Sequence, residues 1–250
     1  MSPDRTAEMN EPLAAHPSVE MVYLYYDNPE MLRVQLDCWN GYPKAMARIP
    51  SVILVDDGSP NAPAVEIVRR HGCGVPIRVF RIKEDIPWNF SGARNLGCHQ
   101  ANGWIYVSDI DTLLYENDAK VLFEDRPLEM GRFYMPRRVR LPDMADERPG
   151  IVNLLFHRET FFLIGGYDED YAGHYGREET DFFDRIRRGA QKVKVDESVI
   201  RVMPPTLVPD ACTQGRSRDR ARNVALYERK LALGFPAPAN PLRFSWERVL

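Results

Sequence analysis

Apolar strands alternate with amphipathic helices through the first half of the chain, and this alternation constrains the fold more than any other feature. Four runs rich in apolar and β-branched residues predict strands, at 19–26, 51–55, 77–82 and 104–108. Helical spacing lies between them at 30–39 and 64–71, and Ser91 is a candidate N-cap of a third helix. Strands joined by helices pair in parallel and are covered on both faces. We therefore expect an α/β fold with a mixed, mostly parallel sheet and helices on both faces.

The second half predicts shorter and more mixed elements. Strands are expected at 132–136, 150–157 and 192–195, and helices at 158–164, 180–188 and 218–233. Residues 203–210 are rich in proline and predict an irregular loop. No internal repeat or linker is evident. We therefore expect a mobile leader over 1–17, one domain over 18–200, and a C-terminal loop and helix over 201–250.

Composition narrows the class of protein. The net charge is −3, so no global basic field attracts nucleic acid or an anionic membrane. The four cysteines are scattered without a CxxC pair, which favours a reducing compartment and disfavours a structural zinc site. No apolar run approaches the roughly 20 residues that span a bilayer. The first 17 residues lack the apolar core of a signal peptide. We therefore expect a cytoplasmic protein without a membrane span.

Acidic side chains follow three of the predicted strands. Asp27 follows the first strand, Asp56 and Asp57 the second, and Asp109 and Asp111 the fourth. Ligands of open α/β sheets bind beyond the carboxyl ends of the strands, so these acids are candidates for one site. Aspartate is also common in turns, which by itself would explain Asp56 and Asp57. A carboxylate at that place can otherwise accept the imide N–H of a uracil ring.

Asp109 and Asp111 are a candidate metal site. Two acids two residues apart at the end of a strand point to the same side of a sheet. Carboxylate oxygens suit Mg²⁺ or Mn²⁺, and such an ion suits a diphosphate ligand. Two carboxylates do not complete an octahedron, so diphosphate oxygens and water have to supply most ligands. The alternative is a strand end with solvated acids.

Two acidic blocks follow in the second half. The block at 165–169 (GGYDE) has the glycine content of a tight turn, and 178–181 (EETD) places three acids at a predicted helix start. Acids at a helix start complement the helix dipole. They are also candidates for a general base, because a carboxylate can take the proton of an attacking hydroxyl. Crowded acids raise one another's pKa, which suits a base that works near neutrality.

Four blocks in this order resemble the motifs of GT-A-fold glycosyltransferases, especially inverting family 2 enzymes and β-1,4-galactosyltransferases. The blocks are VILVDDGSP (52–60), PWNFSGARNLG (87–97), YVSDIDTLL (106–114) and LIGGYDEDYAGHYGREETDFFDRI (163–186). The third resembles the Asp-x-Asp strand of the family, and GREETDFF (176–183) within the fourth resembles its Gly-x-Glu-Asp-x-Asp block. The resemblance implies a GT-A, Rossmann-like fold with a donor half at 18–115 and an acceptor half at 116–200. It also implies inverting transfer of a hexose or N-acetylhexosamine from a UDP-sugar to an acceptor hydroxyl.

The same resemblance implies roles for residues of the donor half. The nucleotide-sugar would be bound by Tyr25, Tyr26, Asp56, Asp57, Asn89, Arg94 and Asp109. Asp57 would accept from uracil. Asp111 would bind Mn²⁺ or Mg²⁺ directly, with Asp109 beside it.

In the acceptor half, the resemblance implies that Tyr175 stacks on the acceptor and that Glu178 holds its hydroxyls. Glu179 would be the base. The family usually has Asp at that position, and the longer Glu side chain shifts the carboxylate. Asp181 is therefore a second candidate for the base.

A second departure concerns the metal. The family often supplies a late His as a further ligand, and 199–205 (VIRVMPP) contains none. Arg201, or the group Arg216, Arg218 and Arg220, is a candidate to balance the diphosphate charge instead. The loop and the basic segment after it have the composition of a lid that orders over the donor and excludes water. A solvated basic helix is the alternative.

The acceptor and the activity leave alternatives open. The resemblance favours a glycan or a lipid-linked saccharide as acceptor. The basic run 216–222 would also suit DNA phosphates, with Trp88 or Tyr175 stacking on a flipped, hydroxylated base. The Glu at the base position and the missing His also suit a non-catalytic module that binds a sugar nucleotide or a glycan.

Overall fold

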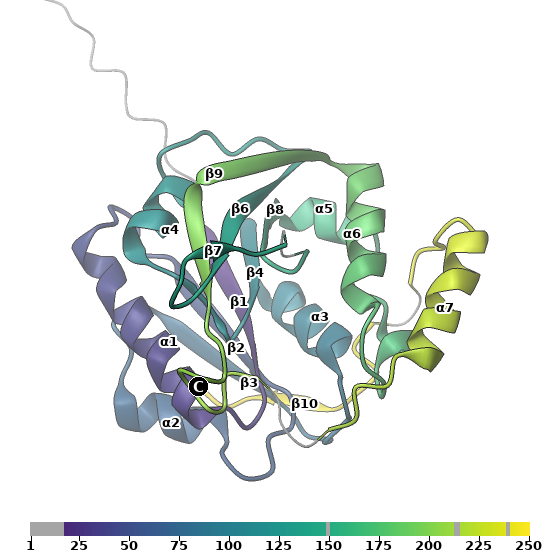
Figure 1. The fold of residues 1–250 in the computed structure, drawn as a ribbon, viewed down its shortest axis with the longest axis horizontal. Coiled ribbons are helices and arrows are strands. Elements are labelled where there is room, and N and C mark those ends of the chain that lie inside the picture. The colour runs from purple at the N-terminus through teal and green to yellow at the C-terminus, as the bar shows by residue number, and fades with distance from the viewer. Residues whose placement is uncertain (1–17, 149–150, 213–215, 239–240) are drawn as a thin grey trace, which may run out of the picture.

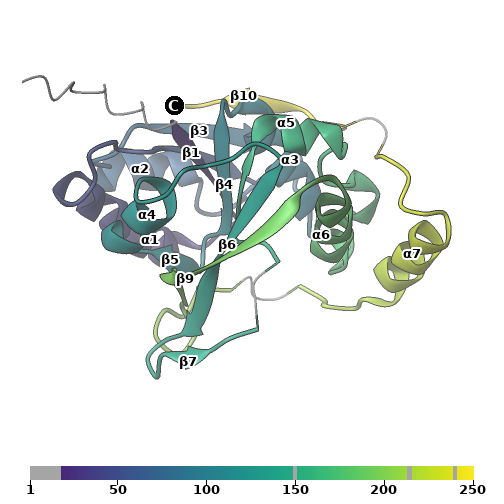
Figure 2. The same cartoon turned by 90° about the horizontal axis from the view of Figure 1, so that it is seen from above.

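A computed structural model describes residues 18–148, 151–212, 216–238 and 241–250 (Figure 1). The mobile leader predicted over 1–17 lies outside the described residues, and so do residues 213–215 of the predicted lid. The described chain forms a central sheet between two layers of helices (Figure 2). The predicted α/β fold is therefore confirmed.

Ten strands form one sheet in the described part of the chain. Their order is β10 (Trp246–Arg248), β3 (Ile77–Ile82), β2 (Ser51–Asp56), β1 (Val19–Tyr25), β4 (Trp104–Asp109), β8 (Leu154–His157), β6 (Arg132–Arg140), β9 (Gln191–Val202) and β5 (Thr112–Leu114), with β7 (Ala145–Asp146) paired to β6. Strands β3, β2, β1 and β4 are parallel neighbours, as are β6 and β9. The other pairs are antiparallel. Parallel neighbours need long connections, which the helices of the first half provide.

Helices cover both faces of the sheet, as predicted. One face carries α1 (Pro29–Gly41), α2 (Ala64–His71) and α4 (Glu116–Phe123), and the other carries α3 (Phe90–Gln100), α5 (Arg158–Leu163) and α6 (Glu178–Gly189) (Figure 2). Helix α7 (Ala221–Ala232) lies outside α6, and η1 (Tyr42–Lys44) and η2 (Glu169–Tyr171) are short 3-10 turns. Side chains of β1 alternate between the two cores, with Met21 and Tyr23 in one and Val22 and Leu24 in the other.

Helix α3 lies very close to the sheet. A Cβ at Gly97 would lie 2.3 Å from Val22 Cγ1, and a Cβ at Gly92 would lie 2.3 Å from Phe244 Cε1. Only glycine fits at these two positions of the FSGARNLG block without a shift of its neighbours. The close approach holds Arg94, on the same helix, against the carboxyl end of β4.

Two helix starts differ from the sequence prediction. Ser91 is not the N-cap of α3, because the N-cap is Asn89 and the helix begins at Phe90. The helix predicted from 218 begins at Ala221, whose N–H donates to the Asp219 carboxylate at 2.9 Å. The side chains next to the two helix starts have partners that residue spacing does not reveal. Asn89 donates to Asp57, and Asp219 accepts from Ala221.

The strand predictions were less complete in the second half. The strand predicted at 150–157 begins only at Leu154, whereas β6 and β9 extend well beyond 132–136 and 192–195. The sequence analysis missed α4, β5, β7 and β10. Much of β9 is exposed and charged. Its buried residues are isolated along the strand and do not form an apolar run. Strand β10 is the edge of the sheet beside β3 and is exposed along its length.

The fold brings the predicted acidic positions together. In the register of the parallel strands, Tyr25 pairs with Asp56, and Leu24 pairs with Asp109. The carboxyl ends of β1, β2 and β4 therefore lie side by side at one edge of the sheet, which is where open α/β sheets bind ligands.

Candidate active site

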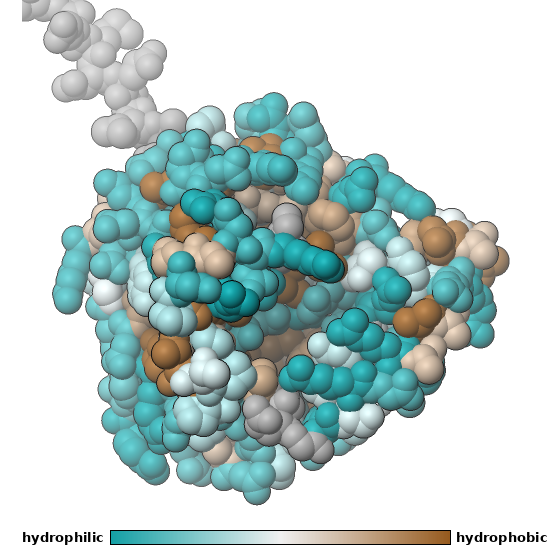
Figure 3. Space-filling view, viewed as in Figure 1, coloured by the Kyte–Doolittle hydropathy of each residue, from teal (hydrophilic) through white to brown (hydrophobic). Residues whose placement is uncertain are grey.

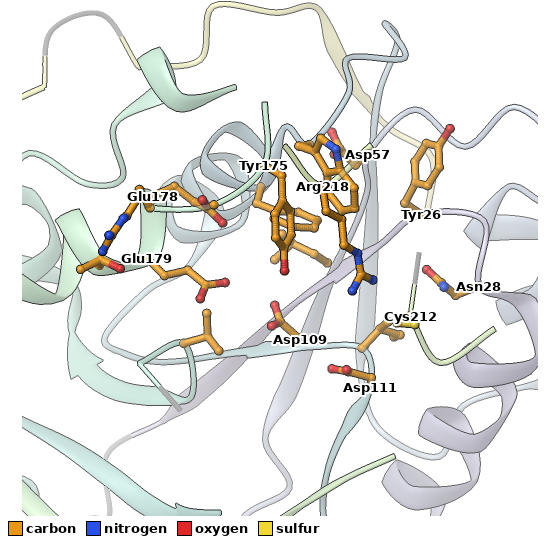
Figure 4. Close-up of a pocket in the computed structure, with 18 of the residues that line it drawn as sticks. Tyr26, Asn28, Asp57, Asp109, Asp111, Tyr175, Glu178, Glu179, Cys212 and Arg218 are labelled. Carbon is orange, nitrogen blue, oxygen red and sulfur yellow. The ribbon is translucent and has the colours of Figure 1, made fainter. Parts of the chain in front are cut away.

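A pocket of ≈ 480 Å³ opens at this edge of the sheet. Its walls come from the ends of β1 and β4, the start of α6 and the segment before α7. The face seen in Figure 3 is hollowed near its centre, with hydrophilic residues around the opening. The predicted site residues that line the pocket are Tyr25, Tyr26, Asp57, Asp109, Asp111, Tyr175, Glu178 and Glu179 (Figure 4). The other four, Asp56, Asn89, Arg94 and Asp181, lie outside its lining.

Asp57 occupies one end of the pocket, near Tyr26 (Figure 4). It is 3% exposed and accepts a hydrogen bond from Asn89 Nδ2 at 3.0 Å. Burial raises the pKa of Asp57 well above its usual range. The Arg216 guanidinium lies 4.0 Å from the ring centroid of Tyr26. Asn89 thus orients Asp57, and a carboxylate held this way retains capacity to accept from a ligand N–H.

Asp56 and Tyr25 have partners within the protein. Asp56 accepts from the backbone N–H groups of Ser59 and Ala64, each at 2.8 Å, and so fixes the turn that leads into α2. The Tyr25 hydroxyl donates to the Ala62 carbonyl at 2.5 Å. Asp56 therefore shapes the loop beside Asp57, and its role in nucleotide binding stays a prediction.

A tight turn between β4 and β5 carries Asp109 and Asp111. Thr112 Oγ1 donates to the Asp109 carbonyl at 2.9 Å, and Asn153 Nδ2 donates to Thr112 Oγ1 at 3.1 Å. Burial, followed by the neighbouring charge of Asp109, raises the pKa of Asp111 to about 7. Two half-buried carboxylates that repel each other in a pocket are a donor set that fits Mg²⁺ or Mn²⁺.

The end of β9 lies beside this turn, since the Met203 N–H donates to the Asp111 carbonyl at 2.8 Å. The region in which a late His was expected is therefore adjacent to the acid pair. Over the described ranges, no group of three or more His, Cys, Asp or Glu side chains is arranged to hold a metal ion. Arg201, one candidate to balance diphosphate charge, pairs with Asp118 at 2.6 Å instead. The acid pair thus fits an ion whose other ligands are diphosphate oxygens and water.

Glu178 and Glu179 begin α6 at the opposite wall of the pocket (Figure 4). The preceding Arg177 has a φ of 76°, a left-handed conformation that is uncommon outside glycine and occurs at strained functional turns. Burial, followed by the charge of Glu179, raises the pKa of Glu178 to about 8, and burial also raises the pKa of Glu179. Asp181 is 1% exposed and pairs with Arg185 at 2.6 Å. Glu179 is therefore the better placed of the two predicted bases.

An aromatic pair borders the pocket near the start of α6. The ring centroids of Trp88 and Tyr175 lie 4.7 Å apart, and Trp88 Nε1 donates to the Ser217 carbonyl at 2.7 Å. The guanidinium groups of Arg218 and Arg220 lie 5.6 Å and 5.0 Å from the Tyr175 ring centroid. The basic segment before α7 thus packs against the pocket and brings two arginines to it.

Sequence reasoning missed three polar residues of this site. Arg138 lines the pocket from β6, beyond the point at which the strand was predicted to end. Thr112 and Asn153 support the turn that carries the acid pair. Residues 137–140 (RRVR) do not alternate between polar and apolar side chains, so no local pattern extends the predicted strand to Arg138. Nothing local marks Asn153, which meets the turn only through the pairing of β8 with β4.

No protein-family model matches the chain, and no curated protein matches it. Solved structures match over most of its length. S. aureus TarS 1–349 in complex with UDP-GlcNAc matches 90% of this chain and 68% of its own, with a TM-score of 0.68 and 10% identity. GalNAc-T7 with UDP, GalNAc and Mn²⁺ matches 86% and 48%, with a TM-score of 0.63 and 15% identity. The mannosyltransferase PcManGT from Pyrobaculum calidifontis, in complex with GDP-Man and Mn²⁺, matches 89% and 66%, with a TM-score of 0.59 and 15% identity.

The chain has the GT-A fold. The comparison confirms the fold that the four sequence blocks implied. The chain spans between about half and two thirds of the length of these GT-A structures. None of the helices that the structure describes has both the length and the apolar character that crossing a bilayer requires.

The crowded acids predict how stability depends on pH. In the folded protein the pKa is about 8 for Glu178 and about 7 for Asp111, above the values of unfolded carboxyls. At every pH between the unfolded pKa and the folded pKa of these groups, the folded state therefore binds more protons than the unfolded state. The free energy of unfolding falls as the pH rises through the folded values. Without added metal, we expect the melting temperature to be a few degrees higher at about pH 6 than at about pH 8.5. Glu178→Gln should flatten this dependence, and a melting temperature that rises over this range would contradict it.

Proposed function

We propose that this chain is a metal-assisted, inverting glycosyltransferase that moves a hexose or N-acetylhexosamine from a UDP-sugar to an acceptor hydroxyl. The observation that carries the proposal is a single pocket with the paired acids Asp109 and Asp111 on one side and Glu179 on the other (Figure 4). The ligands of the matched GT-A structures support it, since they include UDP-GlcNAc, UDP with Mn²⁺, and GDP-Man with Mn²⁺. The cytoplasmic location and the division into leader, domain and lid stay predictions.

The donor side is proposed to run from Asp57 to Asp111. Asp57 accepts the uracil imide N–H, which cytosine lacks, and Tyr26 contacts the nucleotide. The diphosphate then lies toward Asp109 and Asp111, at the end of β4. A divalent cation bound at these acids offsets the charge that grows on the departing diphosphate.

The reaction that this arrangement supports is a single in-line displacement. Glu179 takes the proton of the acceptor hydroxyl, and the hydroxyl oxygen forms a bond to the anomeric carbon. The bond between that carbon and the diphosphate oxygen breaks on the opposite face, and UDP leaves. The anomeric configuration is therefore inverted. Glu178 holds acceptor hydroxyls, and Tyr175 gives the acceptor an apolar face.

Arg218 is proposed to balance diphosphate charge in place of a late His. Its side chain lines the pocket and points into it on the side of Asp109 and Cys212 (Figure 4). Arg216, by contrast, pairs with Asp85 outside the pocket lining. A guanidinium is well suited to this task because its planar fork matches phosphate oxygens.

We expect Arg218→Ala to weaken UDP binding about 10-fold or more, and to weaken uridine binding much less, because only UDP carries the diphosphate. Calorimetric titration of UDP and uridine with Mn²⁺ present measures both. Arg222→Ala is the matched control, since Arg222 donates to the Asp170 carbonyl at 3.1 Å and lies outside the pocket lining. Equal losses for UDP and uridine would show that Arg218 does not bind the diphosphate.

A donor and acceptor screen tests the proposed function. UDP release is measured with UDP-glucose, UDP-galactose and their N-acetyl forms, each with and without Mn²⁺. The acceptors are glycans, lipid-linked saccharides and duplex DNA that carries a hydroxylated base. Metal-dependent UDP release that needs both a donor and an acceptor supports the proposal. UDP binding without release from any donor would favour a non-catalytic module instead.

A further inference from the structure

A buried arginine joins the two acidic sides of the pocket. Arg94 is 0% exposed, and its Nη2 donates to Asp109 Oδ1 at 2.8 Å and to Glu179 Oε1 at 2.9 Å. Its Nη1 lies 4.0 Å from Glu178 Oε1. The sequence resemblance assigned Arg94 to the donor, yet the side chain has no surface in the pocket. It lies behind the acids, on α3, and contacts a ligand only through them.

Aromatic rings hold the guanidinium in place. Arg94 Cζ lies 5.5 Å from the ring centroid of Phe90 and 5.3 Å from that of Tyr167. Tyr167 stacks on Phe182 of α6 with ring centroids 3.8 Å apart, and its backbone is bonded to the Asn95 side chain. Helices α3 and α6 together therefore fix the orientation of the arginine.

Asp109 and Glu179 each accept the bond from Arg94 with one carboxylate oxygen, and the second oxygen of each stays available. Within the described part of the chain, no hydrogen bond reaches Asp109 Oδ2 or Glu179 Oε2. Both carboxylates line the pocket, so these second oxygens are available to ligands. A charge-assisted bond at one oxygen restricts rotation of a carboxylate and leaves its other oxygen as an acceptor.

A second buried arginine shows what a structural ion pair looks like in this fold. Arg185 pairs with Asp181 and also donates to the carbonyls of Ile164 and Gly166. Among the described residues, Arg94 has no such backbone partners, and two of its three nitrogens, Nε and Nη1, lack a hydrogen bond, against Nη2 alone in Arg185. Unpaired buried donors cost stability, so Arg94 is poorly suited to a purely structural role.

We propose that Arg94 is the positioning residue of this site, which fixes Glu179 relative to Asp109 and couples the metal-binding acid to the base. The inference rests on the proposed function and deepens it. Because both bonds come from one nitrogen, a change at either acid alters the bond to the other. A cation held at Asp109 would weaken the attraction of this acid for the guanidinium, and Arg94 would then bond mainly to Glu179. Arg94 thus links the two walls of the pocket without touching donor or acceptor.

Kinetics of Arg94→Lys test the positioning role. Lysine keeps the charge but lacks the planar group that fits between the two rings. We expect kcat to fall about 30-fold or more and KM for the UDP-sugar to change less than about threefold, since a displaced base slows the chemical step. The matched control is Arg185→Lys, which should lower the melting temperature with kcat unchanged.

Two kinetic results would overturn the proposal. A kcat of Arg94→Lys within about twofold of the wild type would leave only a structural role. A loss of UDP affinity as large as the loss of kcat would instead make Arg94 a donor-binding residue. If Arg94→Lys does not fold, Arg94→Gln is measured in its place, because it keeps a planar donor group.

A second measurement needs no turnover. Mn²⁺ affinity, with UDP present, is measured for the wild type, Glu179→Gln, Arg94→Gln and the double variant. We expect Glu179→Gln to weaken Mn²⁺ binding about threefold, because Arg94 then has its only charged hydrogen-bond acceptor in Asp109, and we expect no such effect in the Arg94→Gln background. An equal effect in both backgrounds would overturn the coupling. A wild type that binds UDP and Mn²⁺ but releases no UDP from any donor would overturn the proposed function alone.

Discussion

Glu179→Gln is expected to lower the rate of UDP release in the transfer reaction about 1,000-fold, because an amide cannot take the acceptor proton. The side chain keeps nearly the same size and can still accept the bond from Arg94 Nη2. At saturating Mn²⁺, UDP affinity should stay within about twofold, since Glu179 lies across the pocket from Asp57 (Figure 4). Steady-state UDP release and calorimetric titration of UDP measure the two quantities.

Asp181→Asn is the matched comparison for the base. Asp181 is buried in an ion pair with Arg185, so its loss should lower the melting temperature because it leaves a buried cation unpaired. Its carboxylate is not part of the pocket lining, and we expect the main effect on stability rather than on kcat. A folded but inactive Asp181→Asn beside an active Glu179→Gln would assign the base to Asp181.

The second large effect is expected from Asp111→Ala, which should reduce metal-dependent turnover about 100-fold or more. The variant removes one of the two acids of the candidate metal site, and diphosphate oxygens cannot replace a fixed protein ligand. Titration of Mn²⁺ against the rate of UDP release measures the loss, with a weaker apparent affinity expected for the ion. Removing this acid also relieves its repulsion with Asp109, so the variant should fold.

Asp146→Asn is the control for that experiment, because the Asp146 side chain is exposed, pairs with Arg137 and lies outside the pocket lining. It should leave both the rate and the Mn²⁺ dependence unchanged. If Asp111→Ala and a chelator both left turnover unaffected, the reaction would not need the metal. Arginines such as Arg218 would then balance the diphosphate charge.

The elements of the first half were predictable because each carries its own signal. Strand β2 is a short run of buried apolar residues, and α2 shows helical spacing that ends at Gly72. The turn residues after the strands identified Asp57, Asp109 and Asp111 as candidates before any contact was known. By contrast, β9 and β10 were underestimated because exposed, charged strands depend on their neighbours for pairing.

The sequence alone determined the α/β class, the order of the motif blocks and the acidic residues around which a site forms, because these depend on local periodicity and spacing. The tertiary structure decided how those acids differ. Asp181 is buried in an ion pair with Arg185, Asp56 stabilises the turn after β2, and Glu179 lines the pocket. Arg94, which the resemblance assigned to the donor surface, is buried and bonded to both Asp109 and Glu179. The bonds of Arg94 join residues 15 and 85 positions apart, which no local pattern encodes. The contacts of Asp181 and Asp56 are short in sequence, but local spacing alone does not tell a carboxylate with a protein partner from one that faces a pocket.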